Sequence, residues 1–198
     1  QPYSVLIPAA GNSGRMGMPK LLLPFEDHTF CEEIYKRYSD AGAEKIVFVI
    51  NQQLAAEIER MQLHQLKSLQ FIVNDNPSFG RFRSVQIGLS GIPDNIPCFL
   101  QNSDNPFVHE HVLLQLLNNS QPDCTVIPFF EKQPGHPVLI GADILKNLLH
   151  CSANDANLRT EIKKYLTKPV DVSTADILLN INTPEDYQRV FGKPVFKK

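Results

Sequence analysis

The 198-residue chain is long enough to bury a hydrophobic core without metal or disulfide cross-links, and its length predicts one domain over residues 1–198. Hydrophobic residues make up 42% of the chain and charged residues 20%, as is ordinary for a globular protein. The net charge of −2 gives no general electrostatic basis for binding nucleic acid, and no apolar run approaches the roughly 18 residues of a membrane span, so neither partner is expected.

Short apolar runs alternate with longer segments of helical periodicity along the whole chain. The predicted strands are Ser4–Pro8, Lys45–Ile50, Leu69–Val73, Cys98–Gln101, Thr125–Phe129, Pro137–Ile140 and Asp176–Ile181. The predicted helices are Phe30–Ala41, Leu54–Leu66, Phe82–Leu89, Glu110–Asn118, Ala142–Leu149, Asn157–Leu166 and Pro184–Val190. Continuously apolar strands indicate a mostly parallel sheet that is covered on both faces. The predicted fold class is therefore α/β, a three-layer α/β/α doubly wound fold of the Rossmann-like type.

The first predicted strand runs into a loop of small residues that contains two cations. The loop begins Ala9-Ala10-Gly11-Asn12-Ser13-Gly14 and continues to Arg15 and Lys20. Small side chains let backbone N–H groups approach an anion, and glycines permit the dihedral angles that aim several N–H groups at one point. The loop is neither a Walker P-loop nor a GxGxxG turn. With its two cations it predicts polyphosphate binding, and the alternative is an ordinary glycine-rich turn.

An acidic residue follows the fourth predicted strand. In a doubly wound sheet, ligands bind beyond the carboxyl ends of the strands, and Asp104, followed by Pro106, lies at such a position. Magnesium typically takes one or two carboxylates together with phosphate oxygens and waters. We therefore expect Asp104 to hold Mg²⁺ on a triphosphate, with an Asp turn before a proline as the alternative.

Polar residues also follow the other predicted strands. Asn51 ends the second strand. Arg81 and Arg83 precede Ser84, which opens a helix, and their loop would hold a second anion or the ribose, or be an exposed charged turn. His136 lies between a glycine and a proline, and is either a substrate contact or a structural histidine. Arg159 lies in a helical pattern, where a surface role is the default.

The four cysteines point to a reducing compartment. They are widely spaced, with no pattern typical of a zinc site, and two of them, Cys98 and Cys124, lie in apolar runs where buried thiols are expected. No signal peptide is visible, so a cytoplasmic location is predicted. Because the chain begins with Gln1 rather than Met, we expect that it has been processed or trimmed there.

Taken in chain order, several segments resemble the family of molybdenum cofactor nucleotidyltransferases. They are Arg15-Met16-Gly17, Lys20 with Leu22-Leu23-Pro24, Asn76-Pro77 with Gly80 and Ser84-Val85, Asp104 with Pro106, Pro134-Gly135-His136-Pro137, Leu158-Arg159, and Asn182-Thr183-Pro184-Glu185-Asp186-Tyr187. The resemblance covers nearly the whole chain and implies a fold of the nucleotide-diphospho-sugar transferase type. Ala9-Ala10-Gly11 and the Pro-Gly-His-Pro segment are more similar to the cytidylyltransferase branch, which implies CTP over GTP.

The resemblance implies a Mg²⁺-dependent transfer of a nucleoside monophosphate, CMP by preference, from an NTP to a phosphate-bearing acceptor of the molybdopterin type. Pyrophosphate would leave, and an apo-molybdoenzyme would receive the product. The implied catalytic residues are Arg15, Lys20 and Asp104. The implied nucleotide-binding residues are Ala9, Ala10, Gly11, Asn12, Ser13, Gly14, Lys20, Asn51, Asn76 and Ser84. His136 and Arg159 would contact the acceptor, and Asn182 would join Asp104 as a metal ligand.

The chain departs from the cytidylyltransferase pattern in two segments, of which one is the loop from Asn76 to Gly80, which is shorter than expected and bears on the contacts with base and ribose. Asn180-Ile181-Asn182 stands where that branch usually has Asp-Ile-Asp, and it is more similar to the guanylyltransferase form. An Asn carbonyl can bind Mg²⁺ but brings no charge. The opening loop also resembles methylerythritol phosphate cytidylyltransferases. The alternatives are therefore a cytidylyltransferase acting on a sugar or methylerythritol phosphate, and a non-catalytic carrier of cofactor or nucleotide.

Overall fold

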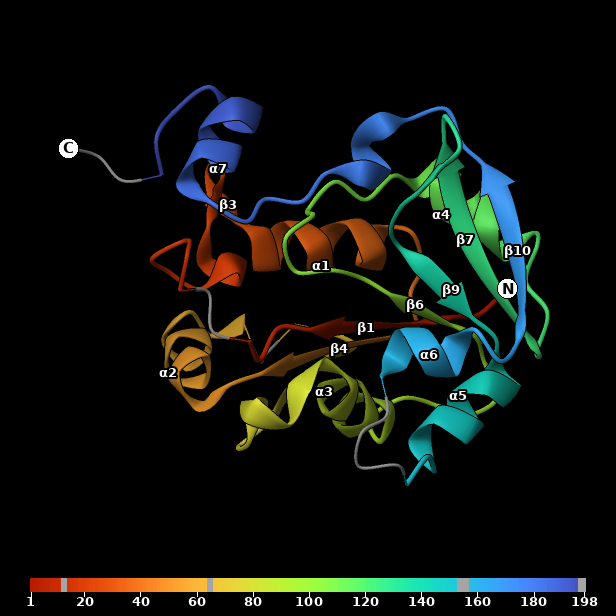
Figure 1. Ribbon diagram of the computed structural model, residues 1–198. Coiled ribbons are helices and arrows are strands. Elements are labelled where there is room, and N and C mark those ends of the chain that lie inside the picture. Colours follow the sequence, from red (N-terminus) through yellow and green to blue (C-terminus); the bar gives the residue numbers. More distant parts are fainter. Residues whose placement is uncertain (12–13, 64–65, 153–156, 196–198) are drawn as a thin grey trace.

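In the computed structural model, which describes residues 1–11, 14–63, 66–152 and 157–195, helices cover both faces of a central sheet (Figure 1). The strands of this sheet are β1 (Ser4–Pro8), β4 (Lys45–Ile50), β5 (Leu69–Val73), β6 (Cys98–Leu100), β7 (Cys124–Phe130), β8 (Gln133–Pro134), β9 (Val138–Ile140) and β10 (Leu166–Asp171). Their order is β10-β7-β9-β6-β1-β4-β5, and β8 pairs with β7 outside this row. The predicted mostly parallel α/β fold is confirmed.

The sheet changes character between β6 and β7. Strands β4, β5 and β6 join β1 in a wholly parallel group, whereas β9 pairs antiparallel with both β6 and β7. The chain reverses after β7 in a two-residue turn in which Glu131 and Lys132 both adopt positive φ angles of 47° and 67°. Turns of this kind join antiparallel strands because their twist matches that of the sheet. The reversal sends β8 and β9 back across the sheet.

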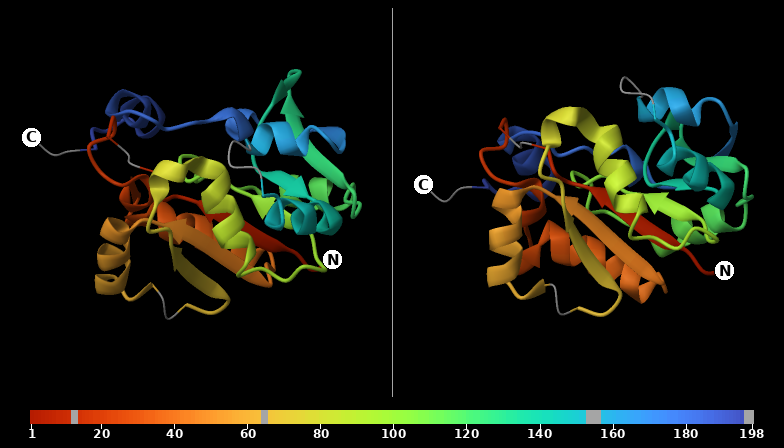
Figure 2. Two further views of the ribbon diagram at one scale, coloured as in Figure 1. Left: turned by 60° about the horizontal axis from the view of Figure 1, so that its bottom comes forward. Right: turned by 90° about the horizontal axis from the view of Figure 1, so that it is seen from below.

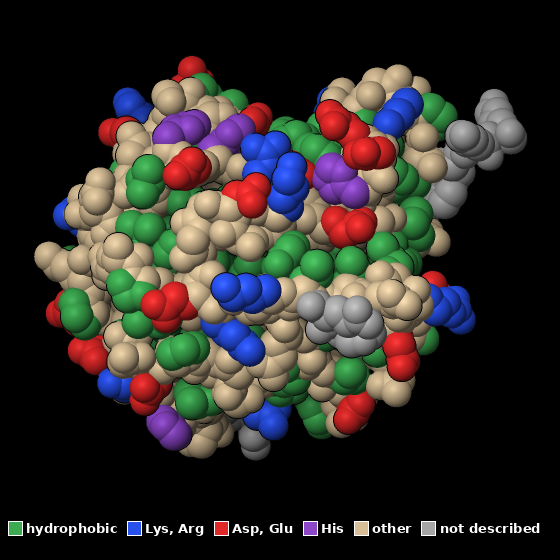
Figure 3. Space-filling model, turned by 180° about the vertical axis from the view of Figure 1, so that it is seen from behind, with side chains coloured by type: hydrophobic (Ala, Val, Ile, Leu, Met, Phe, Trp, Pro, Cys, Tyr) green, Lys and Arg blue, Asp and Glu red, His purple; other side chains and the backbone are tan. Residues whose placement is uncertain are grey.

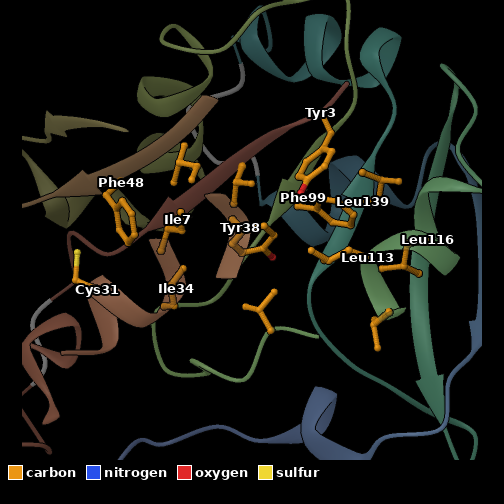
Figure 4. Close-up of a cluster of buried hydrophobic side chains, with 14 of the residues drawn as sticks. Tyr3, Ile7, Cys31, Ile34, Tyr38, Phe48, Phe99, Leu113, Leu116 and Leu139 are labelled. Atoms are coloured by element: carbon orange, nitrogen blue, oxygen red, sulfur yellow. The ribbon is translucent and has the colours of Figure 1, made fainter. Parts of the chain in front are cut away.

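The helices form two layers, one on each face of the sheet (Figures 1 and 2). One layer consists of α1 (Phe30–Asp40), α2 (Gln52–Arg60) and α4 (Glu110–Leu117). The other consists of α3 (Gly80–Leu89), α5 (Ala142–Leu149) and α6 (Leu158–Ile162). In the first layer, Ile34 and Tyr38 of α1 pack against Ile7, Phe48 and Phe99 of the strands (Figure 4). Burial of such side chains typically contributes about 1.5–3 kcal/mol each to the free energy of folding.

A third apolar cluster joins the C-terminal helix to the first loop. Helix α7 (Pro184–Phe191) lies beside the separate hairpin of β2 (Pro24–Phe25) and β3 (His28–Thr29) (Figure 1). Tyr187 packs in this cluster with Met16 and Leu23, and its hydroxyl donates to the Pro24 carbonyl at 2.8 Å. The ring centroids of Tyr187 and Phe191 lie 4.5 Å apart. This packing anchors both sides of η1 (Lys20–Leu22), the 3₁₀ helix that begins with Lys20.

Two sequence predictions about secondary structure are wrong. The predicted strand Asp176–Ile181 is instead the 3₁₀ helix η4 (Ala175–Leu178), which begins with a hydrogen bond from the Asp176 N–H to the Thr174 hydroxyl. Strand β10 was not predicted, and its first residue, Leu166, was expected to end a helix. This edge strand carries Lys168 and Pro169, residue types that protect sheet edges and that are atypical of buried strands.

Other predictions about burial are confirmed. Cys98 and Cys124 are buried, all four cysteines are unpaired thiols, and burial raises the pKa of the Cys98 thiol.

Among the described residues no helix combines the length and the apolar character that crossing a membrane would take. Charges of both signs are interspersed on the face shown in Figure 3. The 3₁₀ helix η3 (Pro77–Phe79) ends in an exposed aromatic side chain, that of Phe79.

Candidate functional site

A cleft of about 560 Å³ opens where β1, β4 and β6 end. The residues predicted to bind nucleotide that line it are Ala9, Ala10, Gly11, Gly14, Lys20, Asn51 and Ser84. The predicted residues Asn12 and Ser13 lie outside the residues that the structure describes. A cleft at this edge is expected because the carboxyl ends of parallel strands meet there. The structure thus brings most of the predicted nucleotide-binding loop to one cavity.

The small-residue loop is braced by Asn51. The Asn51 side-chain amide donates to the Ala10 carbonyl at 3.3 Å, and its oxygen accepts from the Leu54 N–H at 2.9 Å, which caps α2. The first turn of α2 therefore faces the cleft, and both Gln53 and Leu54 line it. A helix N-terminus carries a partial positive charge and unpaired N–H groups, which favour anions nearby. The start of α2 would therefore favour an anion in the cleft.

Three segments that are distant in the sequence meet at the Lys20 ammonium. Its Nζ lies 3.2 Å from Asp104 Oδ2 and 2.6 Å from Asn182 Oδ1. A backbone hydrogen bond of 2.9 Å from the Ile181 N–H to the Asp104 carbonyl holds the two loops together. The structure therefore brings together Lys20, which is predicted to be catalytic, and the two residues that the resemblance implies as metal ligands.

Buried amides position the Asp104 loop, a feature that the sequence analysis missed. The Gln101 side chain accepts from the Tyr38 hydroxyl at 2.8 Å and donates to the Asn102 and Asn105 carbonyls at 3.0 and 2.7 Å. The Asn105 amide in turn donates to the Asp176 carbonyl at 2.8 Å. Polar groups this deeply buried need such partners. Three amide side chains directly after an apolar strand were the available signal.

Asn182 is positioned by the start of α7. Asp186 Oδ2 accepts from the N–H groups of Asn182 and Thr183 at 3.0 and 3.1 Å, and the Thr183 hydroxyl accepts from the Asp186 N–H at 3.2 Å. These bonds form a capping box. The hydrogen bond from the Asn182 backbone, with that from Arg189, lowers the pKa of the Asp186 carboxyl. The cap therefore fixes the backbone from which the Asn182 side chain reaches Lys20.

The oxygens at this point suit a hard divalent cation. Asp104 Oδ1 is buried and has no hydrogen-bond partner among the described residues, and the other oxygens are Asp104 Oδ2 and Asn182 Oδ1. Magnesium prefers such oxygen ligands and completes its shell with phosphate oxygens and waters. Within the described residues no group of three His, Cys, Asp or Glu side chains could hold a metal. A cation at Asp104 would therefore depend on ligands from the substrate.

Arg81 reaches the cleft from the first turn of α3 and donates to Asn102 Oδ1. In the next turn the Ser84 hydroxyl accepts from the buried Asn74 side chain at 3.0 Å. The predicted nucleotide-binding residue Asn76 is exposed, and only its backbone N–H bonds to Asn74, at 3.0 Å. The structure thus places Arg81 and Ser84 in the cleft, whereas Asn76 lies beside it.

The remaining predicted residues are not among the described residues that line the cleft. Arg15 and Arg159 are both exposed. The His136 N–H donates to the Ile177 carbonyl at 2.9 Å, and its Nδ1 is buried without a hydrogen-bond partner in the described part of the chain. Burial, together with the positive charge of Arg81, lowers the pKa of His136 to about 4. The imidazole is therefore neutral near pH 7.

The comparisons with known proteins agree with this geometry. The sequence profile of the family described as MobA-like NTP transferase domain matches residues 5–170. The molybdenum cofactor cytidylyltransferase of Escherichia coli (strain K12) is 26% identical over 182 residues, which is 92% of each chain.

Solved structures share the fold. Rv0371c from Mycobacterium tuberculosis H37Rv has a TM-score of 0.79 at 18% identity, covering 96% of this chain and 98% of that one. Its complex with manganese has a TM-score of 0.75 at 18% identity, covering 98% and 99%. Molybdopterin-guanine dinucleotide biosynthesis protein A from Archaeoglobus fulgidus has a TM-score of 0.66 at 21% identity, covering 94% and 95%.

Proposed function

We propose that this chain transfers CMP from CTP to the phosphate group of a molybdopterin-type acceptor. The premise is that the chain belongs to the family of MobA-like NTP transferase domains and is a nucleotidyltransferase. The observation that carries this proposal is the convergence of Lys20, Asp104 and Asn182 at the small-residue loop. That convergence combines an anion-binding loop, a cation and oxygen ligands for a metal in one cleft. A nucleoside triphosphate needs all three.

The proposed reaction is a displacement at phosphorus. An oxygen of the acceptor phosphate forms a bond to the α-phosphorus, the bond from that phosphorus to the oxygen bridging to the β-phosphorus breaks, and pyrophosphate leaves. A phosphate monoester carries most of its second negative charge at pH 7, so the attacking oxygen needs no protein base. Catalysis then depends on positioning and on stabilising charge.

Each part of the cleft has a role in this reaction. Backbone N–H groups around Ala10 would bind the β- and γ-phosphates, while Lys20 and Arg15 would offset the charge that develops on the leaving pyrophosphate. Asp104 and Asn182 would hold a divalent cation, Mg²⁺ in this proposal, which when bound neutralises phosphate charge. The acceptor would approach on the side of His136, whose neutral imidazole can hydrogen-bond to it.

Two features of the chain bear on the choice of nucleotide. Ala9 and Ala10 line the cleft, and with the relationship to the E. coli cytidylyltransferase they support CTP. Asn182, which stands where the cytidylyltransferase branch usually has Asp, supports GTP as the second candidate. If the first loop determines which nucleotide binds, CTP will bind more tightly than GTP.

Thermal denaturation with Mg²⁺ and each of CTP, GTP, ATP and UTP tests this proposal. A nucleotide at 100 times its dissociation constant stabilises the folded state by about 2.7 kcal/mol, which is a measurable shift. We expect a response to CTP, followed by pyrophosphate release when molybdopterin is added. A response to GTP alone would transfer the proposal to guanylyl transfer. No response to any nucleotide would contradict it and favour a carrier.

A further inference from the structure

We propose that the Lys20 ammonium is the resident cation of the metal site, and that a divalent cation enters only after a bound triphosphate has drawn Lys20 away from Asp104 and Asn182. This inference rests on the proposed function for its nucleotide step. Its metal step concerns the nucleotide-free protein and can be measured separately.

The geometry places the ammonium where a metal would lie. Lys20 Nζ is 2.6 Å from Asn182 Oδ1 and 3.2 Å from Asp104 Oδ2. With Asp104 Oδ1, which has no hydrogen-bond partner among the described residues, these are the three side-chain oxygens that Asp104 and Asn182 offer to a metal. Magnesium binds its oxygens at about 2.0–2.1 Å. An ammonium and a magnesium ion cannot both lie between the same oxygens at these distances, so the two cations must compete.

The charges make this competition unfavourable to a metal alone. The Asp104 carboxylate carries one negative charge, the Asn182 amide carries none, and the Lys20 ammonium carries one positive charge. The set is therefore neutral before any ligand binds. A divalent cation entering it would meet a like charge a few ångströms away, whereas a triphosphate would bring several negative charges. The nucleotide changes the balance for both cations at once.

The backbone at Lys20 is anchored, whereas its long side chain can change conformation. Its neighbour Leu21 is buried in the main core, and Leu23 is buried beneath α7, so η1 is anchored at both ends. The ammonium itself sits on a flexible four-carbon stem. Lys20 also lines the cleft, on the loop proposed to bind the phosphates. If a triphosphate binds to that loop, a change in the Lys20 side-chain conformation would bring the ammonium to it.

Asn182 sets the strength of this exchange. One additional negative charge at a fixed distance attracts a divalent cation twice as strongly as it attracts an ammonium. An aspartate at position 182 would therefore favour the metal over Lys20, although it would also pair with the lysine. With the neutral amide at position 182, the Lys20 ammonium occupies the site in the nucleotide-free protein. The nucleotide therefore binds first and the metal second.

Titration of the nucleotide-free protein with Mn²⁺, followed by the electron paramagnetic resonance signal of free Mn²⁺, tests the inference. Lys20→Met removes the competing charge and keeps the side-chain length, so we expect Mn²⁺ to bind about tenfold or more tightly than to the unmodified protein. Asn182→Asp should also tighten binding. Lys36→Met removes an exposed lysine on α1 and serves as the charge-matched control, with unchanged binding expected.

The outcomes separate this inference from the proposed function. Mn²⁺ binding to K20M that is no tighter than to the unmodified protein would overturn the inference, as would weaker binding to N182D. Because N182D retains Lys20, it carries the test if thermal denaturation reveals that K20M is unfolded. Tightened Mn²⁺ binding in both variants, without any response of the unmodified protein to nucleotides, would support the cation exchange while contradicting nucleotidyl transfer.

Discussion

The two halves of the sheet differ in where they put their loops. Every described residue that lines the cleft lies between Pro8 and Asp104, in the half whose strands are all parallel. None of the described residues from β7 onward lines it, and this half contains the antiparallel strands β8 and β9. Parallel strands deliver successive loops to one edge, whereas antiparallel strands divide them between both edges.

The second half nevertheless contributes through contacts with the first. Ile181 bonds to Asp104 through the backbone and brings Asn182 to Lys20, and His136 bonds to Ile177 just before that segment. The comparison teaches that the parallel half builds the cleft, while the other half adds single side chains at its border. The predictions below test this division of roles.

The largest effect is expected for the side chains that both halves share. Asp104→Ala and Lys20→Ala should each lower nucleotidyl transfer by about 10²–10³-fold or more, because in the proposed reaction Lys20 offsets phosphate charge and Asp104 holds the cation that does so. Steady-state pyrophosphate release measures this. Asp171→Ala, an exposed carboxylate on β10, is the control and should keep full activity. A variant at 104 or 20 that keeps more than about a tenth of the activity would remove that residue from the catalytic set.

The sequence predicted the parallel half well for a physical reason. Strands buried on both faces are continuously apolar, so β1 and β4 have the predicted bounds. The half-buried edge strand β5 also has its predicted bounds. The loops of these strands must then meet at one edge, which predicts the cleft. The family resemblance implied that Lys20 and Asn182 belong to one site, but the hydrogen bond between them, across 162 positions, was not predicted.

The other half was harder to predict because its signals are weak. Edge strand β10 is largely polar, and the apolar residues Ile177 and Ile181 are buried from a 3₁₀ helix and a loop rather than from a strand. The amide network of Gln101 and Asn105 could not be predicted either, since it depends on partners brought close only by folding. The roles of Arg15 and Arg159, which do not line the cleft, remain predictions.

The free energy of unfolding should depend on pH because of His136, the partly buried histidine near the cleft. Since burial holds the folded pKa of His136 near 4, below its unfolded value, the unfolded state binds more protons between those pKa values. Stability is therefore unaffected above the unfolded pKa and is lost as the pH falls toward 4. The full loss is about 3 kcal/mol. Urea unfolding of the protein and of His136→Gln at pH 7 and near pH 4 measures it, and an identical pH dependence in both would contradict the prediction.

Glycine substitutions test how tightly each half is packed. A Cβ at Gly88 would lie 2.2 Å from Leu6 Cδ1, and one at Gly135 would lie 2.5 Å from the Ile177 carbonyl oxygen. We expect Gly88→Ala and Gly135→Ala each to cost about 1–3 kcal/mol of unfolding free energy. Gly14→Ala, where the Cβ would meet nothing within 4 Å, is the control. Equal stability of all three variants in urea unfolding would contradict the assigned packing.

The smallest effect is expected when the capping boxes at the starts of α1 and α7 are removed. Their N-cap residues are Thr29 and Thr183. Thr29→Ala and Thr183→Ala should each cost about 1 kcal/mol, or a few degrees in thermal denaturation, because each removes an N-cap. Only Thr183→Ala loosens the backbone next to Asn182, so only this variant should also change the affinity for Mn²⁺. If both variants left metal binding unchanged, the cap would stabilise α7 without positioning Asn182. The second half would then contribute its amide through the Ile181–Asp104 backbone bond alone.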